Sequence, residues 1–132
     1  MIRQTILPFK VKMTRDLITP YAGLALLGEF AAGIRFLQSV DRYLPKPGSG
    51  TEYKPSEYIF PLILILNGGG RSLEDTCQIR ADEGLKEILP LKKIPSSDAF
   101  GNWLRSMGVN GGLNGLEKVN RSLLKRGINM ME

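Results

Sequence analysis

Residues 68–107 read GGGRSLEDTCQIRADEGLKEILPLKKIPSSDAFGNWLRSM, and the spacing of apolar side chains in this stretch decides the fold class. After the glycine break, the spacing predicts three short helices, over Ser72–Ala81, Leu85–Leu89 and Ser97–Met107. Ser72 with Asp75 three residues later is a capping-box pattern, which marks the start of the first helix. Short helices with a polar, partly basic last member are typical of a helix-turn-helix. The same pattern also occurs in trihelical units that serve only for packing.

The last of these helices has two distinct sides. Its apolar side consists of Phe100, Trp103, Leu104 and Met107. Its opposite side carries Ser97, Asp98, Asn102, Arg105 and Ser106. We expect the apolar side to pack in the core, with Trp103 buried, and the polar side to stay exposed. In the first helix, we expect Cys77 on the inner side as a reduced, buried thiol.

The sequence before the glycine break predicts one strand and two helical elements. Apolar residues alternate with Pro8, Lys10 and Lys12, which predicts an edge strand over Thr5–Met13. Thr19-Pro20 is expected to start a helix that continues to about Tyr43. The apolar run Tyr58–Leu66, opened by Pro-Ser-Glu, is interpreted as a core helix.

After a turn rich in glycine and asparagine, Gly108–Gly112, a last helix is expected over Leu113–Arg126, with Gly127 as its stop. One stripe of this helix is apolar: Leu116, Val119 and Leu123. A second stripe is basic: Lys118, Arg121 and Lys125. The prediction is therefore a mostly α protein with one N-terminal strand. It forms a single domain of four parts: a strand or arm (1–16), core helices (17–66), a helix-turn-helix-like unit (67–107) and a basic C-terminal helix (108–132).

Composition narrows the functional classes. The net charge of +5 is concentrated toward the two ends of the 132-residue chain, which favours an anionic partner such as DNA, although ordinary solubility explains it equally well. With no histidine and a single cysteine, neither a zinc site nor an internal disulfide is expected, and a cytoplasmic protein is indicated. The longest apolar run is too short to span a membrane, so no membrane partner is expected.

Two catalytic interpretations do not hold. The glycine break lacks the lysine and the spacing of a phosphate-binding Walker loop. The acidic residues of 74–87 are better explained as helix-terminal charges and an exposed pair than as metal ligands. Since no nucleophile has an evident base beside it, the chain does not look like an enzyme.

Several short blocks of the sequence resemble a known family. They are LITPYAGL (17–24), DRY (41–43), KPSEY (54–58), LNGGGRSLED (66–75), LP (89–90) and IPSSDAF (94–100). With these blocks the chain resembles the N-terminal region of bacterial insertion-sequence transposases of the DDE type, whose catalytic domain has an RNase-H-like fold. The resemblance extends over nearly the whole chain, and residues 66–107 are its most specific part.

The resemblance implies a helical region that engages transposon ends and precedes a catalytic domain. In that domain, three carboxylates hold two divalent metals for strand cleavage and transfer. None of the acidic residues of this chain matches the first of those aspartates. We therefore expect a transposase segment truncated before the DDE domain, inactive alone and without a cofactor of its own.

This interpretation assigns roles to ten residues. Arg71 and Ser72, at a helix start, are expected to hold a backbone phosphate. Ser97, Asn102 and Arg105 are expected to face base edges in the major groove. Five basic residues are expected to contact phosphates: Lys92, Lys93, Lys118, Arg121 and Lys125.

The expected partner is duplex DNA at transposon ends, with a homodimer or a complex with full-length transposase as a further assembly. The protein would be nucleoid-associated when bound. Two alternatives remain open. One is an interaction or dimerisation remnant without useful DNA affinity. The other is an unrelated small helical DNA-binding regulator.

Overall fold

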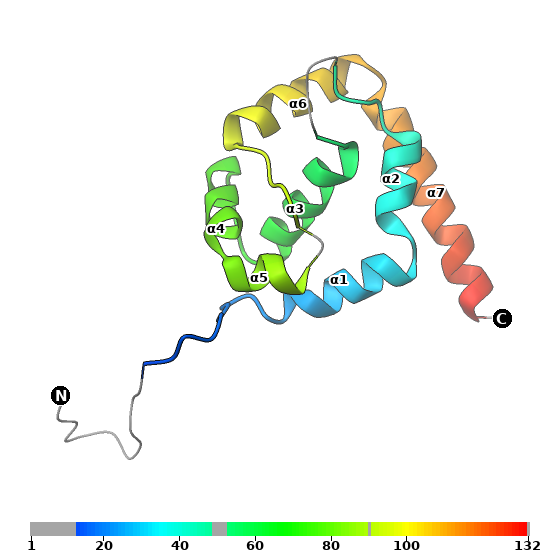
Figure 1. The fold of residues 1–132 in the computed structure, drawn as a ribbon. Coiled ribbons are helices and arrows are strands. Elements are labelled where there is room, and N and C mark those ends of the chain that lie inside the picture. Colours follow the sequence, from blue (N-terminus) through cyan, green and yellow to red (C-terminus); the bar gives the residue numbers. More distant parts are fainter. Residues whose placement is uncertain (1–12, 49–52, 90, 132) are drawn as a thin grey trace.

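The computed structural model describes residues 13–48, 53–89 and 91–131 of the chain (Figure 1). These residues form seven α-helices and one short 3₁₀ helix, joined by turns and loops. They are α1 (Leu24–Gly33), α2 (Phe36–Tyr43), α3 (Pro55–Asn67), η1 (Leu73–Asp75), α4 (Thr76–Ala81), α5 (Glu83–Ile88), α6 (Ser97–Val109) and α7 (Gly112–Met131). The mostly α prediction is confirmed. The predicted strand Thr5–Met13 lies outside the described residues except for Met13, which is exposed and belongs to no helix or strand.

Helix α3 is the central element, and the other helices surround it (Figure 1). The predicted core helix over Tyr58–Leu66 is confirmed, because Tyr58, Phe60 and Leu64 of α3 are all buried. Fully burying one such side chain contributes about 1.5–3 kcal/mol. The start of α3 is fixed by Asp41 of α2, whose carboxylate accepts hydrogen bonds from the Ser56 backbone N–H (2.8 Å) and hydroxyl (2.9 Å). This pair of bonds joins α2 to the central helix.

An aromatic cluster holds α6 against α3. The rings of Tyr58 and Trp103 stack with their centroids 4.7 Å apart and their planes at 5°. Phe100 meets Tyr58 edge to face, at 5.5 Å and 87°. Trp103 is 5% exposed, so its predicted burial is confirmed. Leu104, which was expected on the same apolar side, is instead 41% exposed, because it lies at the margin of the buried stripe.

The single helix predicted from Thr19 to Tyr43 is wrong in two respects. The helix begins at Leu24, because the Thr19 hydroxyl closes a local turn by accepting the Tyr21 backbone N–H (3.1 Å) and also donates to the Asp82 carboxylate. The element is also divided into α1 and α2 at Arg35, which adopts a left-handed conformation with φ 54°. A left-handed residue other than glycine is strained by about 1–2 kcal/mol, so tertiary contacts must hold this elbow.

The helix-turn-helix expectation is not confirmed. Its three predicted helices exist, with somewhat different bounds, but residues 89–96 separate α5 from α6. The turn of a helix-turn-helix has roughly 3–4 residues. Leu91, Ile94 and Pro95 of this connection are buried, so the connection is itself part of the core. Figure 1 shows α5 and α6 at opposite ends of the bundle.

Cys77 is exposed, and the expectation of a buried thiol is wrong. In the short helix α4, Thr76 and Ile79 are the residues buried against the core. A helix turns by about 100° per residue, so Cys77, which follows Thr76, points away from the buried side of α4.

Helix α7 is longer than predicted, and Gly127 lies inside it rather than ending it. A glycine usually ends a helix by adopting a positive φ. Among the described residues, the glycines that do so are Gly69, just after α3, and Gly111, in the turn between α6 and α7. The glycine-rich turn was therefore predicted in the right place, although α6 continues to Val109 before it.

Helices α2 and α7 lie side by side (Figure 1), and a glycine permits their close approach. A Cβ atom built at Gly115 of α7 would lie 2.7 Å from the carbonyl oxygen of Tyr43 and 3.2 Å from Leu44 Cα. Both of these are backbone atoms, so no side chain could move aside to make room. Any side chain larger than hydrogen at this position would push the two helices apart.

We therefore expect opposite effects from the same substitution at two positions of α7. Gly115→Ala should lower the free energy of unfolding by about 1–3 kcal/mol through overpacking. Gly127→Ala has nothing within 4 Å of the new methyl group. It should raise the free energy of unfolding by about 0.5–1 kcal/mol, because alanine loses less backbone entropy in a helix. Thermal unfolding followed by circular dichroism measures both, and an unchanged or higher Tm for Gly115→Ala would contradict the packing.

Candidate nucleic-acid interface

The outer side of α6 carries the two residues that sequence analysis assigned to base edges. Asn102 and Arg105 are both exposed, and Arg105 Nη1 donates a 2.7 Å hydrogen bond to Asn102 Oδ1. The structure therefore brings these two side chains together. Ser97, the first residue of α6, is half-buried and lies at the far end of the helix from Arg105. Asp98 is exposed on α6 and precedes Asn102 by one helical turn, so the charge of this face is mixed.

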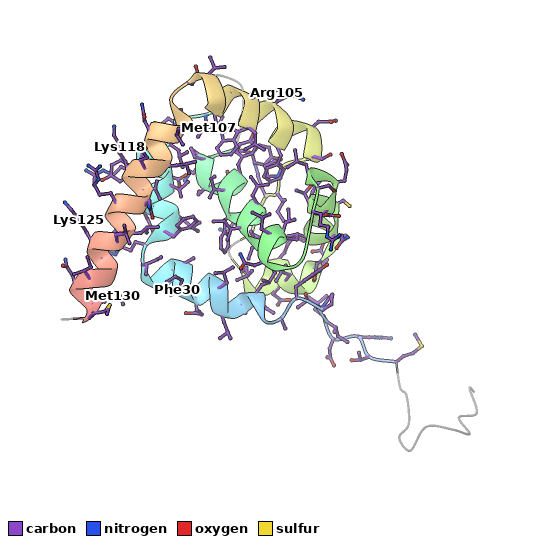
Figure 2. The ribbon with its side chains drawn as sticks, turned by 180° about the vertical axis from the view of Figure 1, so that it is seen from behind. Phe30, Arg105, Met107, Lys118, Lys125 and Met130 are labelled. Carbon is purple, nitrogen blue, oxygen red and sulfur yellow. The ribbon has the colours of Figure 1, made fainter. Side chains whose placement is uncertain are left out.

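The basic stripe of α7 is exposed as expected, and it borders a hollow between α2 and α7. Lys118, Arg121 and Lys125 line this hollow of about 290 Å³ together with Tyr43, Ser122 and Arg126. None of the described residues that line it is acidic. Figure 2 shows Lys118 and Lys125 along the outer side of α7, whereas Arg105 lies beyond the corner between α6 and α7. We call this group of residues the α2–α7 hollow.

Arg126 is a residue of this hollow that sequence analysis did not assign. Its Nη1 atom donates to the backbone oxygens of Ile34 (2.8 Å) and Arg35 (3.2 Å) and to the Ser39 hydroxyl (2.9 Å). The Arg35 carbonyl also accepts the Ser39 backbone N–H (3.2 Å), so the guanidinium is an additional donor to this turn. Arg126 therefore fastens the end of α7 to the strained elbow between α1 and α2. No local sequence signal reveals this, since the partners are about 90 residues apart in the chain.

Tyr43 and Arg42 were also missed as site residues. The half-buried ring of Tyr43 lines the α2–α7 hollow, and the guanidinium carbon of Arg42 lies 5.5 Å from the centroid of that ring. In the sequence they occur only in the short DRY block, where neither the charge pattern nor the helical period distinguishes them. Their closeness to the basic stripe depends on the packing of α7 against α2.

The sequence predicted that Arg71 and Ser72, at the start of η1, hold a phosphate. In the structure, the backbone amides of these two residues are already hydrogen-bonded. The backbone N–H groups of both residues donate to Asp75 Oδ2, at 2.7 Å and 2.9 Å. The carboxylate thus takes the place that an anion would occupy. These two hydrogen bonds hold the pKa of Asp75 below its usual value. The Ser72 hydroxyl also interacts with Asp75, so the exposed side chain of Arg71 is the part of this helix start that remains available to a phosphate.

Lys92 and Lys93 are exposed on the connection between α5 and α6. They lie a few residues before the start of α6 and do not line the α2–α7 hollow. The ten predicted residues therefore belong to separate groups: the pair on α6, Ser97 at the start of that helix, the stripe on α7, the two lysines of the connection, and the two residues at the η1 start. Of these groups, the stripe on α7 lies beside a hollow. None of the described residues that line this hollow is acidic.

Among residues 13–48, 53–89 and 91–131, no group of three or more cysteine, aspartate and glutamate side chains is placed to hold a metal ion. No helix in the same residues is both long and apolar enough to cross a membrane. The chain matches no protein-family model, no curated protein and no solved structure. The resemblance to transposases consequently depends on the sequence blocks alone.

The role of Asp75 predicts a pH dependence. Because its pKa is lowered on folding, its stabilisation should be present above the unfolded value of 3.8 and lost as the pH falls through the folded value. Asp75→Asn should lower the Tm at neutral pH, and this difference from the wild type should vanish in acid. Glu74→Gln is the matched control, since it removes the neighbouring negative charge without breaking a described hydrogen bond. Equal Tm values for the Asp75 variant and the wild type at neutral pH would refute the capping role.

Proposed function

We propose that the chain is the DNA-binding segment of an insertion-sequence transposase, that it recognises transposon ends, and that it has no catalytic activity alone. The observation that carries this proposal is the exposed row of Lys118, Arg121 and Lys125 beside the α2–α7 hollow. Cations that neutralise phosphates release counterions, and this release supplies much of the affinity for DNA. The net charge of +5 supports the same kind of partner.

The geometry of the row suits a phosphate backbone. A helix rises about 1.5 Å per residue, so Lys118 and Lys125 are separated by about 10 Å along α7. Each DNA strand carries one phosphate per roughly 3.4 Å of helix axis, so such a row can contact several phosphates of one strand. Arg126 fixes the helix that carries the row, which lowers the entropy lost on binding.

Sequence preference would come from the exposed face of α6. Arginine and asparagine each form paired hydrogen bonds with base edges, arginine with guanine and asparagine with adenine. The hydrogen bond between Arg105 and Asn102 orients both side chains on the outer surface of the helix. Lys92, Lys93 and the side chain of Arg71 would add phosphate contacts beside them.

Dimerisation, or association with a full-length transposase, is the second candidate, and exposed apolar side chains favour it. Leu26 and Phe30 of α1 are 77% and 63% exposed, and Met130 of α7 is 71% exposed. Figure 2 shows Phe30 and Met130 near the same end of the bundle. An apolar hollow of about 190 Å³ lies beside Phe30, between α1, α3 and α7. Association through this surface would strengthen at high salt, whereas DNA binding would weaken.

The proposed function is tested by fluorescence anisotropy with labelled duplex DNA over a range of salt concentrations. In the test variant, Lys118, Arg121 and Lys125 are all replaced by glutamine. Its affinity should fall, and its slope of log K against log salt should decrease by about 0.9 for each phosphate that the variant no longer neutralises. The expected cause is that the row on α7 no longer releases counterions from the DNA.

The control variant replaces Lys46, Lys54 and Arg80 by glutamine. These three residues are exposed and lie outside the α2–α7 hollow, so the net charge changes equally. Its salt slope should match that of the wild type. Equal losses of affinity in both variants would mean that only net charge matters, and binding unaffected in the test variant would refute the role of the row.

A further inference from the structure

The α2–α7 hollow contains an aromatic ring as well as cations. Tyr43 lines it together with the basic row of α7, and the Arg42 guanidinium carbon lies 5.5 Å from the centroid of the Tyr43 ring. Contacts with duplex phosphates require only cations and hydrogen-bond donors, because the faces of paired bases are stacked inside the helix. A ring beside a row of cations therefore has a chemical use beyond holding a duplex backbone.

The combination suits an unpaired strand. Proteins that bind single strands join a positively charged groove, which follows the backbone, with aromatic side chains on which bases stack. Arginine adds to this because its planar guanidinium also stacks on flat rings. In this hollow, Lys118, Arg121 and Lys125 supply the charges, and Tyr43 supplies the flat surface.

The half-buried Tyr43 side chain packs against the hydrophobic core, and the backbone that carries it is fixed as well. Gly115 of α7 lies against the Tyr43 carbonyl, and the adjacent Leu44 is 4% exposed. On the preceding turns of α2, Val40 is fully buried and Ser39 accepts the hydrogen bond from Arg126. A preorganised aromatic surface loses little entropy when a ligand binds. The volume of the hollow, about 290 Å³, is at the lower end of the range for small-ligand pockets, so it has room for a group no larger than about one nucleotide.

We propose that the α2–α7 hollow binds an unpaired nucleotide of a DNA strand, with its base stacked on Tyr43 and the flanking phosphates held by the basic row of α7. This inference deepens the proposed function and rests on it. It gives the bound DNA a specific form, namely an end or an opened position at which a strand leaves the duplex. Unpaired bases are available only in such a form.

The test compares a labelled thymidine oligomer of about 15 nucleotides with a duplex of equal length, at one salt concentration, by fluorescence anisotropy. For Tyr43→Leu, which keeps an apolar side chain but removes the ring, the ratio of single-strand to duplex affinity should fall by about tenfold, since stacking one base on a ring has an effect of that order. Tyr43→Phe should keep the wild-type ratio, because stacking does not need the hydroxyl. Tyr53→Leu is the matched control, since Tyr53 packs edge to face with Tyr58 and does not line the hollow.

The outcomes separate this inference from the proposed function. If the wild type binds neither DNA form, the proposed function fails. If it binds the duplex but the ratio is the same in Tyr43→Leu, only the stacking inference fails. If Tyr43→Leu does not fold, crosslinking of the wild type to an oligomer that contains iododeoxyuridine decides. A crosslink mapped to Tyr43 supports the proposal, and crosslinks that map only elsewhere overturn it.

Discussion

The packing of α7 against α2 is the contact on which the candidate site depends. Gly115 allows the two backbones to approach closely at Tyr43, and Arg126 fastens the far end of α7 to the elbow between α1 and α2. Arg126 supports the elbow, because Arg35 is held in a left-handed conformation and the Ile34 and Arg35 carbonyls both accept hydrogen bonds from the Arg126 guanidinium. Arg126 thus donates hydrogen bonds to a strained turn and holds the long helix α7 against that turn.

This packing also determines which residues meet. The side of α7 that contains Gly115 and Val119 is buried against the bundle, so Lys118, Arg121 and Lys125 must point outward. Because the same contact brings Tyr43 to the base of this row, the cations and the ring share one hollow. The α6 face with Asn102 and Arg105 is positioned separately, through the stacking of Trp103 on Tyr58. The two candidate surfaces therefore depend on two different sets of core contacts.

Much of this fold follows from local pattern. The apolar run of α3, the buried stripe of Phe100, Trp103 and Met107, and the outward basic stripe of α7 were all predictable, because helical period alone determines which side chains share a face. The break at Arg35, the role of Arg126 and the closeness of Tyr43 to α7 were not, since each depends on a contact between residues distant in sequence. At the start of η1 the capping box was predicted correctly. The consequence of this capping box was not predicted: the Asp75 carboxylate already accepts hydrogen bonds from the Arg71 and Ser72 backbone amides.

A double-mutant cycle between Arg126 and Ser39 tests the α2–α7 contact most directly. The free energy of unfolding is measured for Arg126→Ala, for Ser39→Ala and for the double variant. A hydrogen bond from a charged group to a buried hydroxyl should give a coupling free energy of about 1.5–3 kcal/mol between the two positions. If the two single effects add to within about 0.5 kcal/mol, the side chains do not interact. That result would contradict the hydrogen bond from Arg126 to Ser39, and with it the fastening of this part of α7 to α2.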